Sequence, residues 1–225
     1  MSSIAENIAR VQERLAKALQ RAGRSPNDAR LLAVSKTFSA DIVQEAYDAG
    51  LRSFGENRVQ ELCDKAPKLP SDCEWHLIGQ LQRNKVRPAL EHAGWLHGVD
   101  SLALAQRIQR LADDMKVAPT FLLEVNISGE ESKFGLAPED VEAVLTALPE
   151  GPGCCRGLMT IAPLDAAESE LHAVFAGLRK LRDQLAVRCG TALPELSMGM
   201  SGDMEIAVAE GATIVRIGTA IFGQR

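Results

Sequence analysis

The chain contains the sequence Leu31-Leu-Ala-Val-Ser-Lys36, an apolar run that ends in a lysine. Four consecutive apolar residues are typical of a strand that is buried on both faces, as the strands of parallel sheets are. Residues 40–49 follow with the spacing of a helix, and the next short apolar segment is Arg52–Phe54. This order of strand, helix and strand is the unit from which parallel α/β folds are built.

The same alternation continues along the rest of the chain. The predicted strands are Leu31–Ser35, Arg52–Phe54, Trp75–Ile78, Trp95–Val99, Thr120–Asn126, Arg156–Ile161, Glu195–Met198 and Thr213–Ile217. The predicted helical segments lie near residues 40–49, 57–66, 83–92, 102–115, 138–148, 166–187 and 203–210. Eight such strands close most simply into a (β/α)8 barrel of the TIM type, and an open doubly wound sheet is the alternative. Because no linker or repeat interrupts the pattern, we expect residues 1–225 to form a single domain.

An extra helix is predicted before the first strand. Its apolar residues recur at spacings of four and three: Ile4, Ile8, Val11, Leu15 and Leu19. Ser3 and Glu6 have the spacing of a capping box at its start, and Gly23–Asn27 ends it.

Composition excludes several classes of protein. The 225 residues are 46% hydrophobic and 24% charged, as expected of a globular protein, and the net charge of −5 argues against a general nucleic-acid binder. No apolar run is long enough to span a membrane, and Met1–Gln20 lacks the apolar core of a secretion signal. The five cysteines form no Cys-x-x-Cys motif, so we expect a reduced, cytoplasmic protein without a structural zinc ion. A monomer is the default expectation for such an acidic, single-domain chain.

Lys36 is the first polar residue with a distinct chemical meaning. In a (β/α)8 barrel the active site lies at the C-terminal ends of the strands, where Lys36 follows the first strand. Desolvation and neighbouring cations make a lysine amine nucleophilic, which suits an imine with an aldehyde or a ketone. The alternative is a lysine just past the strand end whose ammonium group reaches water.

Two turns rich in small residues follow the last two predicted strands, Gly199-Met-Ser-Gly-Asp203 and Gly218-Thr219. Such turns bind phosphate, and barrels often hold phosphate after strands seven and eight, although ordinary strand-to-helix turns use the same residues. Ser201 or Asp203 would cap the helix that follows the first turn. An imine-forming lysine beside a phosphate site suits a phosphorylated aldehyde, of which pyridoxal 5'-phosphate (PLP) is one.

Long stretches of the chain resemble the PLP homeostasis proteins, whose fold is similar to the N-terminal barrel of alanine racemase, PLP fold type III. The matching stretches are Leu31-Leu-Ala-Val-Ser-Lys-Thr37, Phe54-Gly-Glu-Asn-Arg-Val-Gln-Glu61, Trp75-His-Leu-Ile-Gly-Gln-Leu-Gln-Arg-Asn-Lys85, Gly157-Leu-Met-Thr160, Leu196-Ser-Met-Gly-Met-Ser201 and Val215-Arg-Ile-Gly-Thr-Ala-Ile-Phe-Gly223. They occur in the family's order and cover nearly the whole chain after the first helix. Gly202 and Gln80 stand at positions where family members differ.

The resemblance implies a cofactor site and assigns neither a catalytic residue nor a metal. The residues that it assigns to PLP are Lys36, Asn57, Met200, Ser201, Gly202, Arg216, Gly218 and Thr219. It implies that Lys36 holds PLP as a Schiff base and that Arg216 faces the pyridine nitrogen. It implies that Ser201, Gly218 and Thr219 hold the phosphate, with help from the backbone at Met200 and Gly202.

Three other residues carry weaker expectations. The resemblance suggests that Met159 lines the cofactor ring and that Asn126 and His76 lie near it, although a hydrogen-bonded strand histidine is the favoured interpretation of His76. Arg83-Asn84-Lys85 is either a guide for incoming phosphate or a solvated loop.

The chemistry of these residues favours binding over catalysis. A guanidinium at the pyridine nitrogen supplies no counter-charge for a pyridinium, so the ring is a weak electron sink. Racemisation needs a second acid–base group, and the only tyrosine, Tyr47, is predicted to pack within the first barrel helix. The leading hypothesis is therefore a cytoplasmic PLP-binding protein without strong catalysis of its own. Its role in PLP homeostasis, with PLP-dependent apoenzymes as candidate partners, is what the resemblance implies. The alternatives are an amino-acid racemase that uses Lys36 as a one-sided base, and a lyase whose Lys36 attacks a sugar phosphate without a cofactor.

Overall fold

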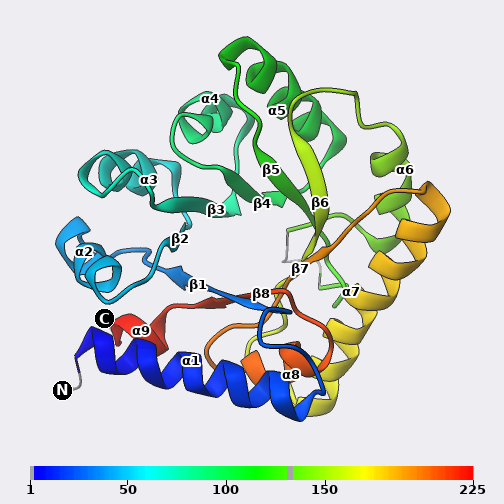
Figure 1. Ribbon diagram of the computed structural model, residues 1–225. Coiled ribbons are helices and arrows are strands. Elements are labelled where there is room, and N and C mark those ends of the chain that lie inside the picture. The colour runs from blue at the N-terminus through cyan, green and yellow to red at the C-terminus, as the bar shows by residue number, and fades with distance from the viewer. Residues whose placement is uncertain (1–2, 131–133, 225) are drawn as a thin grey trace.

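The computed structural model describes residues 3–130 and 134–224, and its centre is a closed barrel of eight parallel strands (Figure 1). The strands, in chain order around the barrel, are β1 (Arg30–Val34), β2 (Ser53–Glu56), β3 (Glu74–Gln80), β4 (Trp95–Val99), β5 (Thr120–Glu124), β6 (Cys154–Met159), β7 (Glu195–Ser197) and β8 (Ile214–Ile217). β1 pairs in parallel with β8, from Arg30 with Ile214 to Ala33 with Ile217. This pairing closes the sheet, so the predicted barrel is confirmed and the open doubly wound sheet is excluded.

Helices surround the barrel and follow the strands as predicted (Figure 1). They are α1 (Ile4–Arg21), α2 (Ala40–Asp48), α3 (Val59–Lys65), α4 (Val86–Leu90), α5 (Leu102–Met115), α6 (Val141–Thr146), α7 (Glu168–Cys189), α8 (Met204–Ala209) and α9 (Thr219–Phe222). Two of them are shorter than predicted, because the segments 83–92 and 138–148 each begin with a 3-10 turn, over Arg83–Lys85 and Pro138–Asp140. In the described residues, no helix combines the length and apolarity that crossing a bilayer requires.

Helix α1 lies outside the barrel against α8 and α9 (Figure 1). The predicted capping box is present, since the Ser3 hydroxyl accepts from the Glu6 N–H and the Glu6 carboxylate accepts from the Ser3 N–H. Two polar contacts fasten α1 to the C-terminal part of the chain. Asn7 donates to the Ile221 carbonyl at 2.8 Å, and Arg14 forms a bidentate ion pair with Glu205 at 2.9 and 3.0 Å.

The inside of the barrel combines an apolar cluster with a polar layer. The cluster consists of Leu32, Val34, Ile78, Leu122, Met159 and Ile214. Because side chains alternate between the two faces of a strand, the same inward face also carries His76, His97, Ser197 and Arg216. These four polar side chains are buried, so each needs a partner inside the barrel.

Candidate functional site

A cavity of about 350 Å³ opens at the barrel mouth, where the C-terminal ends of the strands meet. Seven of the eight residues predicted to bind the cofactor line it: Lys36, Asn57, Met200, Ser201, Arg216, Gly218 and Thr219. The eighth, Gly202, belongs to the same turn as Ser201 but is not among the lining residues. Segments from both ends of the chain therefore meet around one cavity.

Lys36 sits in the turn directly after β1, half-buried, and the backbone beside it is held tightly. Thr37 has a φ of 70°, which is unusual for a β-branched residue and costs free energy. Its N–H donates to the Glu61 carboxylate at 2.6 Å, which holds this strained residue in place. The position of Lys36 is thus set by a contact from α3 and not by β1 alone.

A buried ion-pair network fixes the other side of Lys36. The Lys65 ammonium group donates to the Ser35 carbonyl at 2.9 Å and pairs with Glu56 at 2.8 Å and with Glu61 at 3.2 Å. The Ser35 hydroxyl donates to Glu56 at 2.6 Å. Both neighbours of Lys36 in the sequence are therefore held by the same cluster of charges.

The pKa values of the two carboxyl groups in this network are shifted in opposite directions. Burial raises the pKa of Glu56 in spite of the hydrogen bonds from Lys65 and Ser35. Burial also acts on Glu61, but the Thr37 N–H and Lys65 outweigh it and lower the pKa of Glu61. Glu61 thus remains a carboxylate at neutral pH and holds Thr37.

The two predicted phosphate-binding turns are brought together at the barrel mouth. The Ser201 hydroxyl accepts from the Ala220 N–H at 3.4 Å, which links the turn after β7 to the start of α9. Arg14 of α1 donates to the Ser201 carbonyl at 3.3 Å and supports the turn from outside. The hydroxyl of Ser201 and the Gly218–Thr219 turn thus face one space.

Two details of the first turn differ from expectation. The Met200 N–H already donates to the Asp203 carboxylate, so it is engaged within the turn and the predicted help from the backbone at Met200 does not fit this geometry. Asp203 occupies the N-cap position of α8, as one of the two alternatives predicted, but its side chain makes no hydrogen bond to the helix start. The carboxylate of Asp203 shapes the turn instead.

Arg216 reaches the cavity from β8 and is 4% exposed. It donates to the Ser197 hydroxyl at 2.8 Å and to the Thr160 carbonyl at 2.9 Å. Burial lowers the pKa of its guanidinium to about 10, which leaves the group a cation at neutral pH.

A chain of hydrogen bonds runs from Arg216 through the barrel interior to its opposite end. Ser197 Oγ lies 2.8 Å from His97 Nδ1, His97 Nε2 lies 2.9 Å from His76 Nδ1, and His76 Nε2 lies 2.7 Å from Glu74 Oε1. Burial lowers the pKa of both histidines, so each is neutral and donates from one nitrogen only. The Glu74 carboxylate can only accept, so His76 donates to Glu74, His97 donates to His76, and the Ser197 hydroxyl donates to His97. Both histidines therefore carry their single proton on Nε2.

His76 therefore has the structural role favoured from the sequence. It also stacks on Trp95 with ring centroids 5.3 Å apart. His97 was not identified from the sequence, because no motif around it distinguishes it from an ordinary strand residue.

Glu124 is a second residue of the site that sequence analysis missed. It ends β5, lines the cavity and is 6% exposed. Burial raises its pKa to about 7, and the nearby Arg216 only partly opposes this effect. A charged residue at the end of the buried segment Thr120–Asn126 was the available signal.

The weaker candidates lie outside the cavity lining. Asn126 holds its own loop, since its amide donates to the Glu130 carbonyl at 2.8 Å and its side-chain oxygen accepts from the Gly129 N–H at 3.1 Å. Met159 is buried in the apolar cluster inside the barrel. Neither Asn126 nor Met159 is among the residues that line the cavity.

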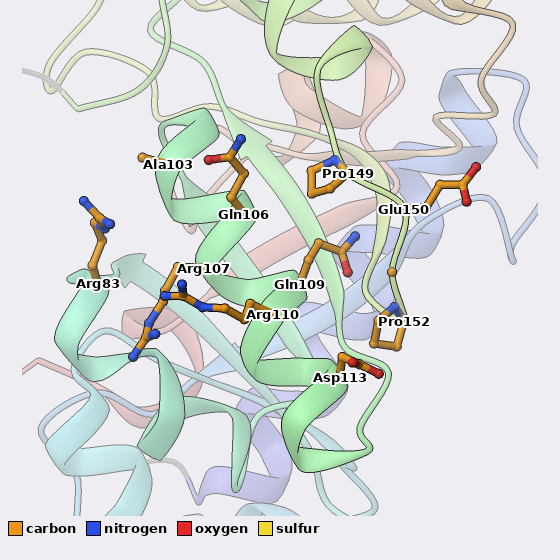
Figure 2. A pocket seen from close by; sticks show the side chains of 11 residues that line it. Arg83, Ala103, Gln106, Arg107, Gln109, Arg110, Asp113, Pro149, Glu150 and Pro152 are labelled. Atoms are coloured by element: carbon orange, nitrogen blue, oxygen red, sulfur yellow. The ribbon is translucent and has the colours of Figure 1, made fainter.

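A larger hollow of about 750 Å³ lies elsewhere, along the outer face of α5. Figure 2 shows Arg83 at one end, Arg107 and Arg110 on α5, and Glu150 on the facing loop. Arg83 of the predicted basic cluster lines this groove and not the cavity at the barrel mouth. Size alone therefore does not mark the candidate site.

The chain matches the family model described as alanine racemase, N-terminal domain, over residues 2–225. It is 49% identical to the pyridoxal phosphate homeostasis protein of Pseudomonas aeruginosa, covering all of this chain and 97% of the relative, and 45% identical to that of Aquifex aeolicus, covering 98% and 97%.

Solved structures give the same grouping. PipY of Synechococcus elongatus with PLP bound has a TM-score of 0.85 and 42% identity, covering 98% of this chain and all of that one. An alanine racemase of Clostridium difficile has a TM-score of 0.76 at 12% identity and covers 95% of this chain and 56% of its own, which shows a shared fold alone.

Proposed function

The chain belongs to the alanine racemase N-terminal domain family and, within it, to the pyridoxal phosphate homeostasis proteins, and from this premise we propose that it binds PLP at the barrel mouth and takes part in PLP homeostasis. The observation that carries the proposal is the convergence of Lys36, Arg216 and the Ser201 turn on one cavity. A relative that is 42% identical over nearly the whole chain has a solved structure with PLP bound.

The residues present fit the chemical groups of PLP. The Lys36 amine would hold the aldehyde carbon as a Schiff base, and the Ser201 hydroxyl with the Gly218–Thr219 turn would hold the phosphate. Arg216 is a buried cation aimed at the cavity and would face the ring nitrogen. A volume of about 350 Å³ is in the range of small-cofactor sites.

The geometry restrains catalysis. Bound PLP supplies an electron sink, whose strength depends on the charge of its ring nitrogen. Arg216 donates from a cationic guanidinium and already gives hydrogen bonds to Ser197 and Thr160, so it cannot supply a negative partner. We therefore propose that the protein holds PLP without strong catalysis of its own.

Transfer of PLP to apoenzymes is the part of the proposal that concerns partners. The apolar side chains of Phe134, Ile161 and Met200 line the cavity and are exposed, and such a rim is the kind of surface that a partner protein covers. We propose that the protein acts in the cytoplasm, and the five free thiols of the chain support this location. We propose that it does so as a monomer, the default expectation for an acidic, single-domain chain.

The test is the visible absorption spectrum after addition of PLP, followed by borohydride reduction and peptide mapping. We expect a yellow wild type whose reduced adduct lies on the peptide that contains Lys36, and no such adduct in Lys36→Ala. Lys180→Ala, an exposed lysine on α7, is the matched control and should behave as wild type. A wild type that takes up no PLP, or an adduct outside Lys36, would refute the proposal.

The absence of strong catalysis has its own test. The loaded protein is incubated with common amino acids in heavy water, and exchange at the α-carbon is followed by NMR. We expect exchange no faster than with free PLP, whereas rapid exchange that Lys36→Ala abolishes would instead indicate an enzyme.

A further inference from the structure

Glu124 is a buried carboxyl group with an unexplained position. The residue is 6% exposed, and among the described residues its carboxyl group, unlike its backbone carbonyl, makes no hydrogen bond or ion pair. The neighbouring Gly98 leaves space for it, because a Cβ atom there would lie 3.3 Å from Glu124 Oε2. A largely buried carboxyl that faces a cavity costs free energy unless water or a ligand in the cavity satisfies it.

The fold places Glu124 opposite Lys36. The eight strands are ordered β1 to β8 around the closed barrel, so β5 stands four strands from β1 in either direction. Glu124 ends β5, and Lys36 follows β1. The carboxyl and the amine therefore approach the same cavity from opposite walls.

The charges around the cavity indicate what Glu124 would bind. PLP is an anion, and its phosphate and ring are served by the Ser201 turn and Arg216 on other strands. A carboxylate repels such a ligand and attracts a cation. Of the charged groups that act on Glu124, Asp100 adds to this attraction and Arg216 opposes it. Among the described residues that line the cavity, Glu124 is the one with a carboxyl group, so the wall formed by the end of β5 is the part of the cavity that suits a positively charged group.

We propose that Glu124 binds the primary ammonium group of a second ligand, an amino acid or a lysine side chain, and accepts a proton from it opposite Lys36. This assignment rests on the proposed function, because the amine so formed competes with Lys36 for the aldehyde carbon of PLP. The residue would thereby govern release of the cofactor.

The exchange is balanced without an oxidant or reductant. The R–NH3+ group gives one proton to the Glu124 carboxylate, which leaves R–NH2 and a protonated carboxyl. The amine nitrogen then forms the C=N bond to PLP while the C=N bond to Lys36 Nζ breaks, and its two remaining protons pass to Lys36 Nζ. A proton acceptor serves best when its pKa lies near the working pH, and burial raises the pKa of Glu124 to about 7.

The charged groups that act on Glu124 come from two other elements. Arg216 on β8 lowers its pKa, and Asp100 after β4 raises it. Lys36 lines the same cavity from β1. The pH dependence of exchange must therefore be measured as a difference between wild type and a variant at Glu124.

The test measures displacement of PLP from the loaded protein at pH 7 by its absorption, for wild type and Glu124→Gln. With glycine we expect the variant to be about 100-fold slower, the usual effect of losing a proton acceptor. With methoxyamine, which is largely uncharged at neutral pH and needs no proton acceptor, both should react at comparable rates. Glu150→Gln, an exposed residue of the outer groove that changes the net charge equally, is the control and should match wild type with both amines.

Two results overturn the inference: unchanged displacement by glycine in Glu124→Gln, or equal slowing with glycine and methoxyamine. An acetylated peptide with one lysine side chain distinguishes the sources, since displacement by glycine only indicates a free amino acid and displacement by the peptide indicates a protein lysine. Failure of wild type to load PLP would refute the proposed function instead. Glu124 is then tested in the ligand-free protein by the carbon-13 NMR signal of its carboxyl group on addition of methylammonium, and an unmoved signal overturns the inference.

Discussion

Replacing Lys65 with methionine tests the idea that a buried ion-pair network positions Lys36. The Lys65 side chain is 8% exposed and Glu56 is fully buried. The substitution leaves Glu56 with only the Ser35 hydroxyl, since Glu56 Oε2 already lacks a partner. Removing one member of a buried pair costs about 3–5 kcal/mol, which is a large part of the roughly 5–15 kcal/mol that stabilises a domain.

The cost should depend on pH with a defined sign. Burial already raises the pKa of Glu56, and loss of Lys65 raises it further. A carboxyl whose pKa is raised in the folded state contributes stability at low pH that is lost as the pH rises through the folded pKa. Lys65→Met should therefore be more destabilising at pH 8 than at pH 5.

The assay is urea unfolding of the ligand-free protein at several pH values. The double variant Glu56→Gln with Lys65→Met removes both charges and should regain most of the lost stability. Lys17→Met, which breaks an exposed ion pair with Glu13, is the control and should change little. A loss under about 1 kcal/mol at pH 8 that does not vary with pH would refute the reasoning, because it lies in the range of an ordinary surface pair.

Three further predictions concern residues around the site. Because the pKa of Glu124 is raised from 4.5 to about 7 in the folded protein, the free energy of unfolding of wild type should fall by about 3 kcal/mol as the pH rises through this range. Glu124→Gln should lack this fall in urea unfolding, and parallel plots of unfolding free energy against pH for the two proteins would contradict the prediction. Ser197→Ala should cost about 1–3 kcal/mol, because it leaves donors of the buried Arg216 without a partner, and a neutral result would show that water replaces the hydroxyl. Arg14→Ala should weaken PLP binding several-fold, because the Ser201 carbonyl loses its hydrogen bond, while the unfolding midpoint should hardly change since the Arg14–Glu205 ion pair is half-exposed. An unaltered affinity for PLP in a fluorescence titration would contradict this prediction.

Much of the architecture was predictable because it depends on local patterns. The apolar run before Lys36 and the alternation of strands and helices indicated the closed barrel that β1 and β8 complete. Seven of the eight residues predicted to bind the cofactor likewise line the cavity, since they follow the strands and the strand ends of a barrel meet.

The polar interior was not predictable from local patterns. The predicted second strand stopped at Phe54, because a charged residue ordinarily ends a buried strand, whereas β2 continues to Glu56. Glu56 stays inside only because Lys65, nine residues later, neutralises it. His97 has its partners on β3 and β7, the latter 100 residues away in the sequence, so only the closed barrel shows the contact.

The hydrogen-bonded chain from Arg216 to Glu74 has a consequence for how this sequence can vary through evolution. Its direction is fixed by the Glu74 carboxylate, which only accepts, and by the two neutral histidines, each of which donates from one nitrogen and accepts at the other. Replacing His97 alone would leave the buried Ser197 hydroxyl without its acceptor and the buried His76 Nδ1 without its donor, and replacing His76 alone would leave the buried His97 N–H without its acceptor. Tolerated substitutions should therefore occur jointly along the chain, and homologous sequences should show coupled changes at these positions even where neither residue touches a ligand.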